Sequence, residues 1–157
     1  MEYDKRKWRD TCLALLASDG WVHARENHRS DLSDSILIDR VARFNVSSAS
    51  RFVDDNFDDL IFETLTDEET GYYLDIIDWF NDESDNEVFI VWKKFDRVIG
   101  KGFCSRKWHE WNDGPASCDE IEVILEKVIN RYGDTSIGIK TAYPLITEAA
   151  HLKWDKR

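Results

Sequence analysis

Hydrophobic residues recur every three or four positions in the first half of the chain, a spacing typical of amphipathic helices. Trp8 and Cys12 share one side of a helix predicted over residues 3–18. A second helix is predicted over residues 34–44, and the polar residues 21–31 between the two are predicted to form a loop. The amino-terminal part of the chain is therefore expected to be helical.

Two more helices are predicted further along. Ser47 or Ser48 is a suitable cap for a helix running to about Thr64, because hydrophobic residues again recur at helical spacing. Another helix should follow Thr66, since Thr66 and Glu69 have the spacing of a capping box. In that motif each side chain accepts a hydrogen bond from the other residue's backbone N–H.

The hydrophobic period changes after residue 86. Residues 87–94 are rich in valine, isoleucine, phenylalanine and tryptophan and predict a strand, and residues 97–103 predict a second one. The short junction at Phe95 and Asp96 indicates a hairpin between these two strands.

The last third of the sequence predicts two helices around a short strand. Ser117 and Glu120 have capping-box spacing and begin a helix predicted over residues 117–132. Residues 135–141 alternate in polarity and predict a strand, and a final helix is predicted over residues 144–153.

This order of elements indicates an α+β fold with amino-terminal helices packed on a small mixed or antiparallel sheet with carboxy-terminal helices. The 157 residues have the length of one domain and are expected to form a single domain over residues 1–157. Residues 84–86 are the weakest point, where a helical half could join a mixed half.

Acidic residues are concentrated in one part of the chain, residues 52–92, hereafter the acidic segment. It contains 14 of the 32 acidic residues and no lysine or arginine, which leaves 32 − 14 = 18 acidic residues against 21 basic ones elsewhere. Nearly all of the formal charge of −11 is therefore local. Concentrated like charge destabilises a compact state and creates a strong directional field. The sign of that field predicts a strongly basic partner.

The carboxylates of the acidic segment recur at helical spacing. If residues 47–64 are helical, Asp54 and Asp58 lie about 6 Å apart along the axis, as do Asp55 and Asp59. Such a row resembles the phosphates of a nucleic-acid strand and would attract a surface that binds phosphates. Trp79 lies within the segment and is the predicted aromatic hot spot. The residues predicted to contact the partner are Asp54, Asp55, Asp58, Asp59, Glu63, Asp75, Asp78, Trp79, Asp82 and Glu83.

These features predict a small acidic inhibitor that binds and blocks a basic protein acting on nucleic acid, such as a nuclease, a restriction enzyme or a CRISPR effector. The leading interpretation is a phage or mobile-element counter-defence protein of the anti-CRISPR or anti-restriction type, which acts as a DNA mimic. The alternative is a bacterial immunity protein that neutralises a nuclease toxin. Both interpretations rest on analogy in size, charge and tryptophan content.

The sequence contains no motif for nucleotide binding, zinc proteolysis or serine hydrolysis, and its three cysteines form no CxxC pair. No metal or cofactor is expected, and the protein is not predicted to be an enzyme. The remaining enzymatic hypothesis is an unrecognised site around Cys104, His109 and Glu110. The sequence does not predict an oligomeric state.

Two further classes of partner are not expected. A pI near 4.8 is the opposite of the basic footprint of a protein that binds nucleic acid directly. The charged start MEYDKRKWRD lacks the apolar region of a signal peptide, and no apolar run approaches the roughly 20 residues that span a bilayer. A cytoplasmic protein without membrane contact is therefore predicted.

Overall fold

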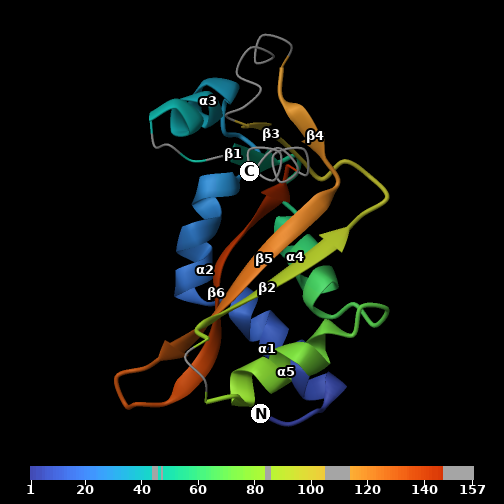
Figure 1. The fold of residues 1–157 in the computed structure, drawn as a ribbon, viewed down its shortest axis with the longest axis vertical. Helices are drawn as coiled ribbons and strands as arrows, with labels where there is room; N and C mark the ends of the chain where they lie inside the picture. Colours follow the sequence, from blue (N-terminus) through green and yellow to red (C-terminus); the bar gives the residue numbers. More distant parts are fainter. Residues whose placement is uncertain (44–45, 47, 84–85, 105–113, 147–157) are drawn as a thin grey trace, which may run out of the picture. The chain divides into compact units, whose positions relative to one another are not determined.

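The structure is a computed structural model that describes residues 1–43, 46, 48–83, 86–104 and 114–146. These residues form an α+β fold with two three-stranded antiparallel sheets, which confirms the predicted class (Figure 1). The helices are α1 (Lys5–Leu16), α2 (Asp19–Ala24), the short 3-10 helix η1 (Arg25–His28), α3 (Asp34–Arg43), α4 (Phe57–Leu65) and α5 (Tyr72–Asn81). The strands are β1 (Ser48–Phe52), β2 (Val88–Lys94), β3 (Gly100–Cys104), β4 (Ala116–Cys118), β5 (Glu120–Ile129) and β6 (Thr135–Leu145).

The chain divides into two compact units that interleave in the sequence. Unit 1 comprises residues 1–26, 56–92 and 123–142, and unit 2 comprises residues 27–55, 93–122 and 143–157. The residues on both sides of positions 84–86 belong to unit 1, so the two compact units do not divide there. A single folding domain over residues 1–157 stays a prediction.

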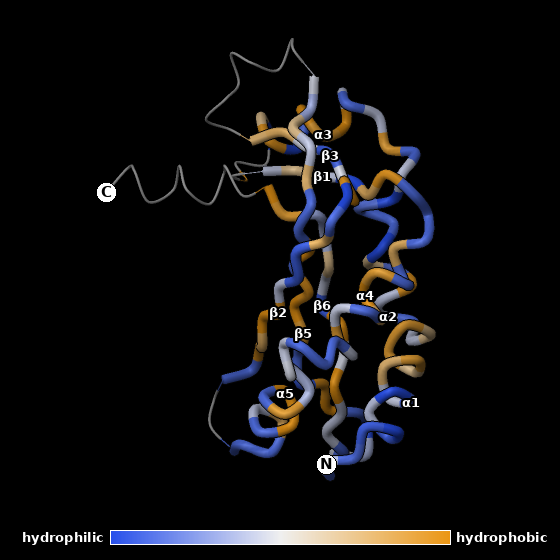
Figure 2. Tube along the Cα trace, turned by 90° about the vertical axis from the view of Figure 1, so that its right-hand side faces the viewer, coloured by the Kyte–Doolittle hydropathy of each residue, from blue (hydrophilic) through white to orange (hydrophobic). Residues whose placement is uncertain are grey.

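Unit 1 packs helices on one side of its part of the β2–β5–β6 sheet. Figure 2 views this sheet nearly edge-on and shows α1, α2 and α4 on the same side of it. Helix α1 begins at an Asp4 cap, whose carboxylate accepts hydrogen bonds from the backbone N–H groups of Arg6 (2.9 Å) and Lys7 (3.1 Å). As predicted, α1 buries Trp8 and Cys12. The strands of unit 1 contribute Val91, Val123, Leu125, Ile137 and Ile139 to the buried side chains.

Unit 2 is built on the β1–β3–β4 sheet. Strands β1 and β3 are antiparallel, with Ser50 opposite Gly102, and β3 continues the sheet to β4. Helix α3, which was predicted from its period, contributes Leu37 and Val41 to a core that also contains Phe103 of β3. Burial of one apolar stripe therefore holds this helix to its sheet.

The helix predicted over residues 117–132 is wrong, because these residues form most of β4 and all of β5. Ile121, Val123 and Leu125 are buried, while the residues between them are half-buried. This alternation has the period of a strand. The expected helical stripe arose because Ile124 and Val128 are also apolar, and they lie on the opposite face of β5.

The predicted hairpin between residues 87–94 and 97–103 is also wrong. Each of the two segments contains a strand, but β2 belongs to the β2–β5–β6 sheet and β3 to the β1–β3–β4 sheet. Strand β6 runs on to Leu145, so Pro144 lies in a strand and does not start a helix. Because β6 is the last strand of its sheet, the missing N–H of a proline is tolerated there. Residues 147–153 of the predicted final helix lie outside the described residues.

Three predicted boundaries in the first half are wrong for local reasons. Residues 21–31 contain the end of α2 and all of η1 instead of a loop, and the helix expected over residues 47–64 is strand β1 followed by α4. The capping box at Thr66 does not form, because the Thr66 hydroxyl donates to the Phe62 carbonyl (2.7 Å) at the end of α4. Helix α5 begins later, after Gly71 at φ 63°.

The close packing of β1 on β3 predicts the effect of one substitution. A Cβ at position 102 would lie 2.5 Å from the Ala49 carbonyl oxygen and 2.9 Å from Ile146 Cδ1. We expect Gly102→Ala to lower the free energy of unfolding by about 2 kcal/mol, the usual penalty for overpacking. Gly20→Ala is the control, because nothing lies within 4 Å of its Cβ in helix α2. Urea unfolding should show a gain of about 0.5 kcal/mol for the control.

Candidate partner-binding surface

The formal charge of the protein belongs to one of the two units. Unit 1 contains 19 of the 32 acidic and 8 of the 21 basic residues, and 8 − 19 = −11. Unit 2 contains the remaining 13 acidic and 13 basic residues and has a formal charge of zero. The entire net charge therefore lies in the unit formed by α1, α2, α4, α5 and parts of β2, β5 and β6.

Asp58 in the first turn of α4 is a structural residue. One carboxylate oxygen accepts the indole N–H of Trp21 (2.8 Å), and the other is bound by the guanidinium group of Arg25 (2.8 Å). Trp21 is fully buried and lies edge-on to Phe57, with ring centroids 6.4 Å apart. Asp58 thus joins α2 to α4, and its predicted contact with a partner stays untested.

Basic residues from outside the acidic segment contact it at other points. The ammonium group of Lys5 in α1 lies 3.4 Å from Glu68, and the guanidinium group of Arg9 lies 5.0 Å above the Phe62 ring. Lys127 of β5 donates to the Asp82 carbonyl (2.6 Å) just after α5. These contacts supply the segment with positive charge that its own sequence lacks.

The predicted helical row of Asp54, Asp55, Asp58 and Asp59 does not form. Asp54 and Asp55 precede α4 and belong to unit 2, and Asp55 accepts a hydrogen bond from the Ser30 hydroxyl. The spacing argument failed because β1 ends at Phe52 and the helix begins only at Phe57.

Four other predicted residues are exposed carboxylates on the helices of unit 1. Asp59 and Glu63 are one turn apart on α4, and Asp75 and Asp78 are three residues apart on α5. Within the described part of the chain no ion pair or hydrogen bond involves these four carboxylates. Figure 1 shows α4 and α5 running in different directions, so the four groups do not form one continuous row. They form two acidic pairs on the surface of one unit.

The remaining acidic candidates lie at the end of α5. Asp82 is the residue at which this helix terminates, and its backbone N–H donates to the carbonyls of Asp78 (3.0 Å) and Trp79 (3.2 Å). Glu83 follows it and is exposed. Their roles in binding a partner stay predictions.

Trp79, the predicted aromatic hot spot, is buried, because only 7% of the residue is exposed. Its ring packs against Phe89 with centroids 5.6 Å apart, and Lys127 lies 5.3 Å from its ring centre. Its indole N–H donates to the Asn86 carbonyl (2.9 Å). These contacts favour a structural role, and the predicted contact of Trp79 with a partner stays untested.

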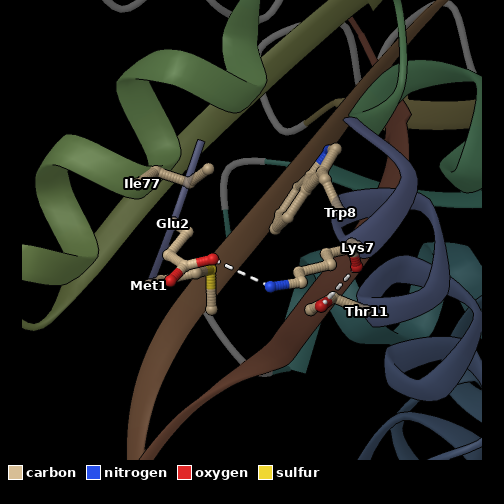
Figure 3. Close-up of a pocket in the computed structure, with 6 residues that line it drawn as sticks. All are labelled: Met1, Glu2, Lys7, Trp8, Thr11 and Ile77. Atoms are coloured by element: carbon tan, nitrogen blue, oxygen red, sulfur yellow. Dashed lines mark hydrogen bonds and ion pairs between the residues drawn. The ribbon is translucent and has the colours of Figure 1, made fainter. Parts of the chain in front are cut away.

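A cavity of about 250 Å³ in unit 1 is lined by residues of the amino-terminal segment, α1 and α5 (Figure 3). Its polar groups bind one another: the Glu2 carboxylate accepts from the Lys7 ammonium group (2.8 Å), and the Thr11 hydroxyl donates to the Lys7 carbonyl (2.9 Å). This ion pair lowers the pKa of Glu2 and raises that of Lys7. The charged groups at this cavity therefore neutralise each other and do not converge on its centre.

The enzymatic hypothesis gains little from the cysteines. Burial raises the pKa of both Cys12 and Cys118 to about 12, so each thiol stays protonated and a poor nucleophile. Cys104 is buried among Cys118 and Ile146, whereas His109 and Glu110 lie outside the described residues. In the described part of the chain, no three histidine, cysteine or acidic side chains are grouped to hold a metal ion.

Of the helices that the structure describes, none is long and apolar enough to cross a membrane.

Comparison with known proteins yields one informative match. No protein-family model matches the sequence, and neither does any curated protein. The fold is similar to a chain in the crystal structure of the CdiA-CT/CdiI complex from Y. kristensenii 33638, with a TM-score of 0.59. The match has 18% sequence identity and covers 78% of this chain and 98% of that chain. At this level of identity the likeness shows a shared fold.

The role of Asp58 predicts a loss of stability that its exposed neighbour does not share. Asp58→Ala leaves the buried N–H of Trp21 without its acceptor, and we expect unfolding to require about 2 kcal/mol less free energy. Asp58→Asn keeps one acceptor oxygen, so its free energy of unfolding should lie between those of Asp58→Ala and the parent protein. Asp59→Ala is the matched control and should change stability by less than about 0.5 kcal/mol. Equal urea midpoints for Asp58→Ala and Asp59→Ala would contradict the structural role.

Because Trp79 is buried, we expect its truncation to lower the stability of the fold. We expect Trp79→Ala to lower the free energy of unfolding by about 3–5 kcal/mol, as for other buried aromatic residues. Trp79→Phe keeps most of the packing but loses the donor to Asn86, so its effect should be about 1–2 kcal/mol. Thermal unfolding measures both effects. A stable Trp79→Ala protein that dissociates faster from its partner would instead support the predicted hot spot.

Proposed function

We propose that this chain is an immunity-type inhibitor that binds a basic toxin domain through unit 1. The observation that carries the proposal is the localisation of the whole formal charge of −11 in that unit. Its exposed carboxylates at Asp59, Glu63, Asp75 and Asp78 face solvent on α4 and α5. A field of this strength attracts basic surfaces and repels nucleic acid and anionic membranes.

The structural match supports this interpretation over phage counter-defence. The CdiA-CT/CdiI complex pairs a toxin carboxy-terminal domain with an immunity protein. Fold likeness at 18% identity cannot select a function by itself. Combined with the acidic charge, however, it favours the role of the inhibitor that neutralises a basic toxin. The anti-CRISPR and DNA-mimic interpretations have no comparable support.

The proposed mechanism begins with electrostatic steering. Opposite charges on the two proteins raise the rate of productive encounters, and the effect weakens as salt shortens the Debye length to about 10 Å at 0.1 M. Binding then covers the active surface of the toxin, so the inhibitor needs no catalytic group of its own. Asp58 supports this surface indirectly by fixing α4 to α2.

Charge reversal on α5 tests the steering. We expect Asp75→Lys/Asp78→Lys to slow association with the basic toxin domain by about tenfold at low salt, the scale of steered association. Folding stability should stay the same or rise, because like charges at this spacing repel each other. The probe is the toxin carboxy-terminal domain that this proposal expects to be encoded beside this chain's gene, purified in an inactive form, and stopped-flow fluorescence measures the rate.

Asp31→Lys/Asp96→Lys is the matched control, because it changes the net charge equally but in unit 2 at exposed positions. This control should retain most of the parental association rate. Equal slowing by the two double variants would show that net charge alone matters and would contradict a binding surface in unit 1. Failure of the parent to bind the toxin domain, or a gene neighbourhood without one, would overturn the proposed function.

A further inference from the structure

The outward face of the β2–β5–β6 sheet in unit 1 exposes several large apolar side chains to solvent. On β2, Phe89 packs against Trp79 and Val91 is fully buried, so the alternate residues point to the other face. Those residues are Ile90 and Trp92, which are 37% and 45% exposed. An apolar pair of this kind on a sheet face calls for an explanation beyond core packing.

Strand β5 adds two apolar residues to the same face. The backbone hydrogen bond from Lys127 N to Glu87 O (3.1 Å) sets the antiparallel register and places Ile90 opposite Ile124. Val128, which is 39% exposed, lies on the same face four residues along β5.

Strand β6 continues this face with Gly138, which has no side chain, between the exposed residues Ser136 and Lys140. A Cβ at Gly138 would lie 2.8 Å from Val128 Cγ2, so these two residues are neighbours on the outward face. Because Gly138 has no side chain, the Val128 side chain packs over the Gly138 backbone. These apolar residues, Ile90, Trp92, Ile124 and Val128, are hereafter called the apolar strip, and Glu122 and Glu126 of β5 lie on the same face.

We propose that this apolar strip is the short-range contact surface for the basic partner, with Trp92 as its anchor. The inference rests on the proposed function and names the surface through which it acts. All four residues belong to the unit that carries the charge of −11, and Glu126 lies beside them on β5. The occupant is therefore a basic protein surface, and its arginine side chains match the site chemically.

Arginine suits this strip for two reasons. Its planar guanidinium group stacks on a tryptophan ring through a cation–π interaction, and it forms paired hydrogen bonds to a carboxylate such as Glu126. Unit 1 already contains a related contact, since the Lys127 ammonium group lies 5.3 Å from the Trp79 ring centre. A second copy of this chain is a poor occupant, because two units of charge −11 repel each other.

The strip and the acidic helices would perform separate tasks. Surface carboxylates act over a distance and mainly change the association rate, whereas a desolvated aromatic anchor mainly changes the dissociation rate. Trp92 is better placed for the second task than Trp79, because 45% of Trp92 is exposed and only 7% of Trp79.

Truncation of Trp92 provides the test, with the same inactive toxin domain as probe. We expect Trp92→Ala to raise the dissociation rate by about tenfold or more, as for aromatic hot spots, while the association rate changes less than about twofold. Val128→Glu places a charge in the strip and should also speed dissociation. Tyr3→Ala is the matched control, because Tyr3 is an exposed aromatic residue of unit 1 outside the sheet.

The outcomes separate this inference from the proposed function. Suppose that the dissociation rate is unchanged for both Trp92→Ala and Val128→Glu, while Asp75→Lys/Asp78→Lys slows association. This result would contradict the proposed role of the apolar strip and would still support the proposed function. Absence of binding by the parent would overturn the function itself. Light scattering that shows a dimer of the free protein, lost in Trp92→Ala, would assign the strip to a second copy and overturn the inference. Urea unfolding of each variant confirms that the compared proteins are folded.

Discussion

Two tryptophan N–H groups fasten the acidic segment to the rest of unit 1. Trp8 of α1 donates to the Leu65 carbonyl (2.8 Å) and Trp21 of α2 to the Asp58 carboxylate (2.8 Å), while Trp79 of α5 donates to the Asn86 carbonyl (2.9 Å) within the segment. A buried indole that lost its acceptor would destabilise the fold by about 1–3 kcal/mol. These three hydrogen bonds, two from α1 and α2 and one within the segment, fix the backbone path of the acidic segment, and the exposed carboxylates depend on that path for their positions.

This arrangement explains how unit 1 stays compact despite its charge. The Lys5–Glu68 pair is largely exposed, and such pairs contribute about 0–1 kcal/mol. Apolar burial contributes far more, because Leu60, Ile61, Leu65, Ile76 and Ile77 are all inside. The acidic side chains lie on the solvent-facing sides of α4 and α5, whose inner sides are apolar. Water and salt screen the repulsion between these carboxylates, so the free energy gained by hydrophobic burial is larger than the cost of the repulsion.

Sequence patterns predicted helices α1 and α3 because one side of each is apolar. Strand β2 was predicted from its content of β-branched and aromatic residues, and the exposed acids of α4 and α5 followed from composition. Strand β5 was predicted as a helix because Ile124 and Val128 make its outward face apolar, which hides the period of two. The bond between Asp58 and Trp21 was missed because the two residues are 37 positions apart and local patterns carry no information about such contacts.

The same apolar outward face that misled the prediction for β5 would normally endanger the protein. Strand β2 lies at the edge of its sheet, and exposed edges with apolar neighbours favour pairing between copies. In unit 1 the charge of −11 opposes such pairing, because two copies of this negatively charged unit repel each other. A basic partner meets no such barrier. Charge can therefore select which protein reaches the strip, and the strip can remain apolar without causing self-association.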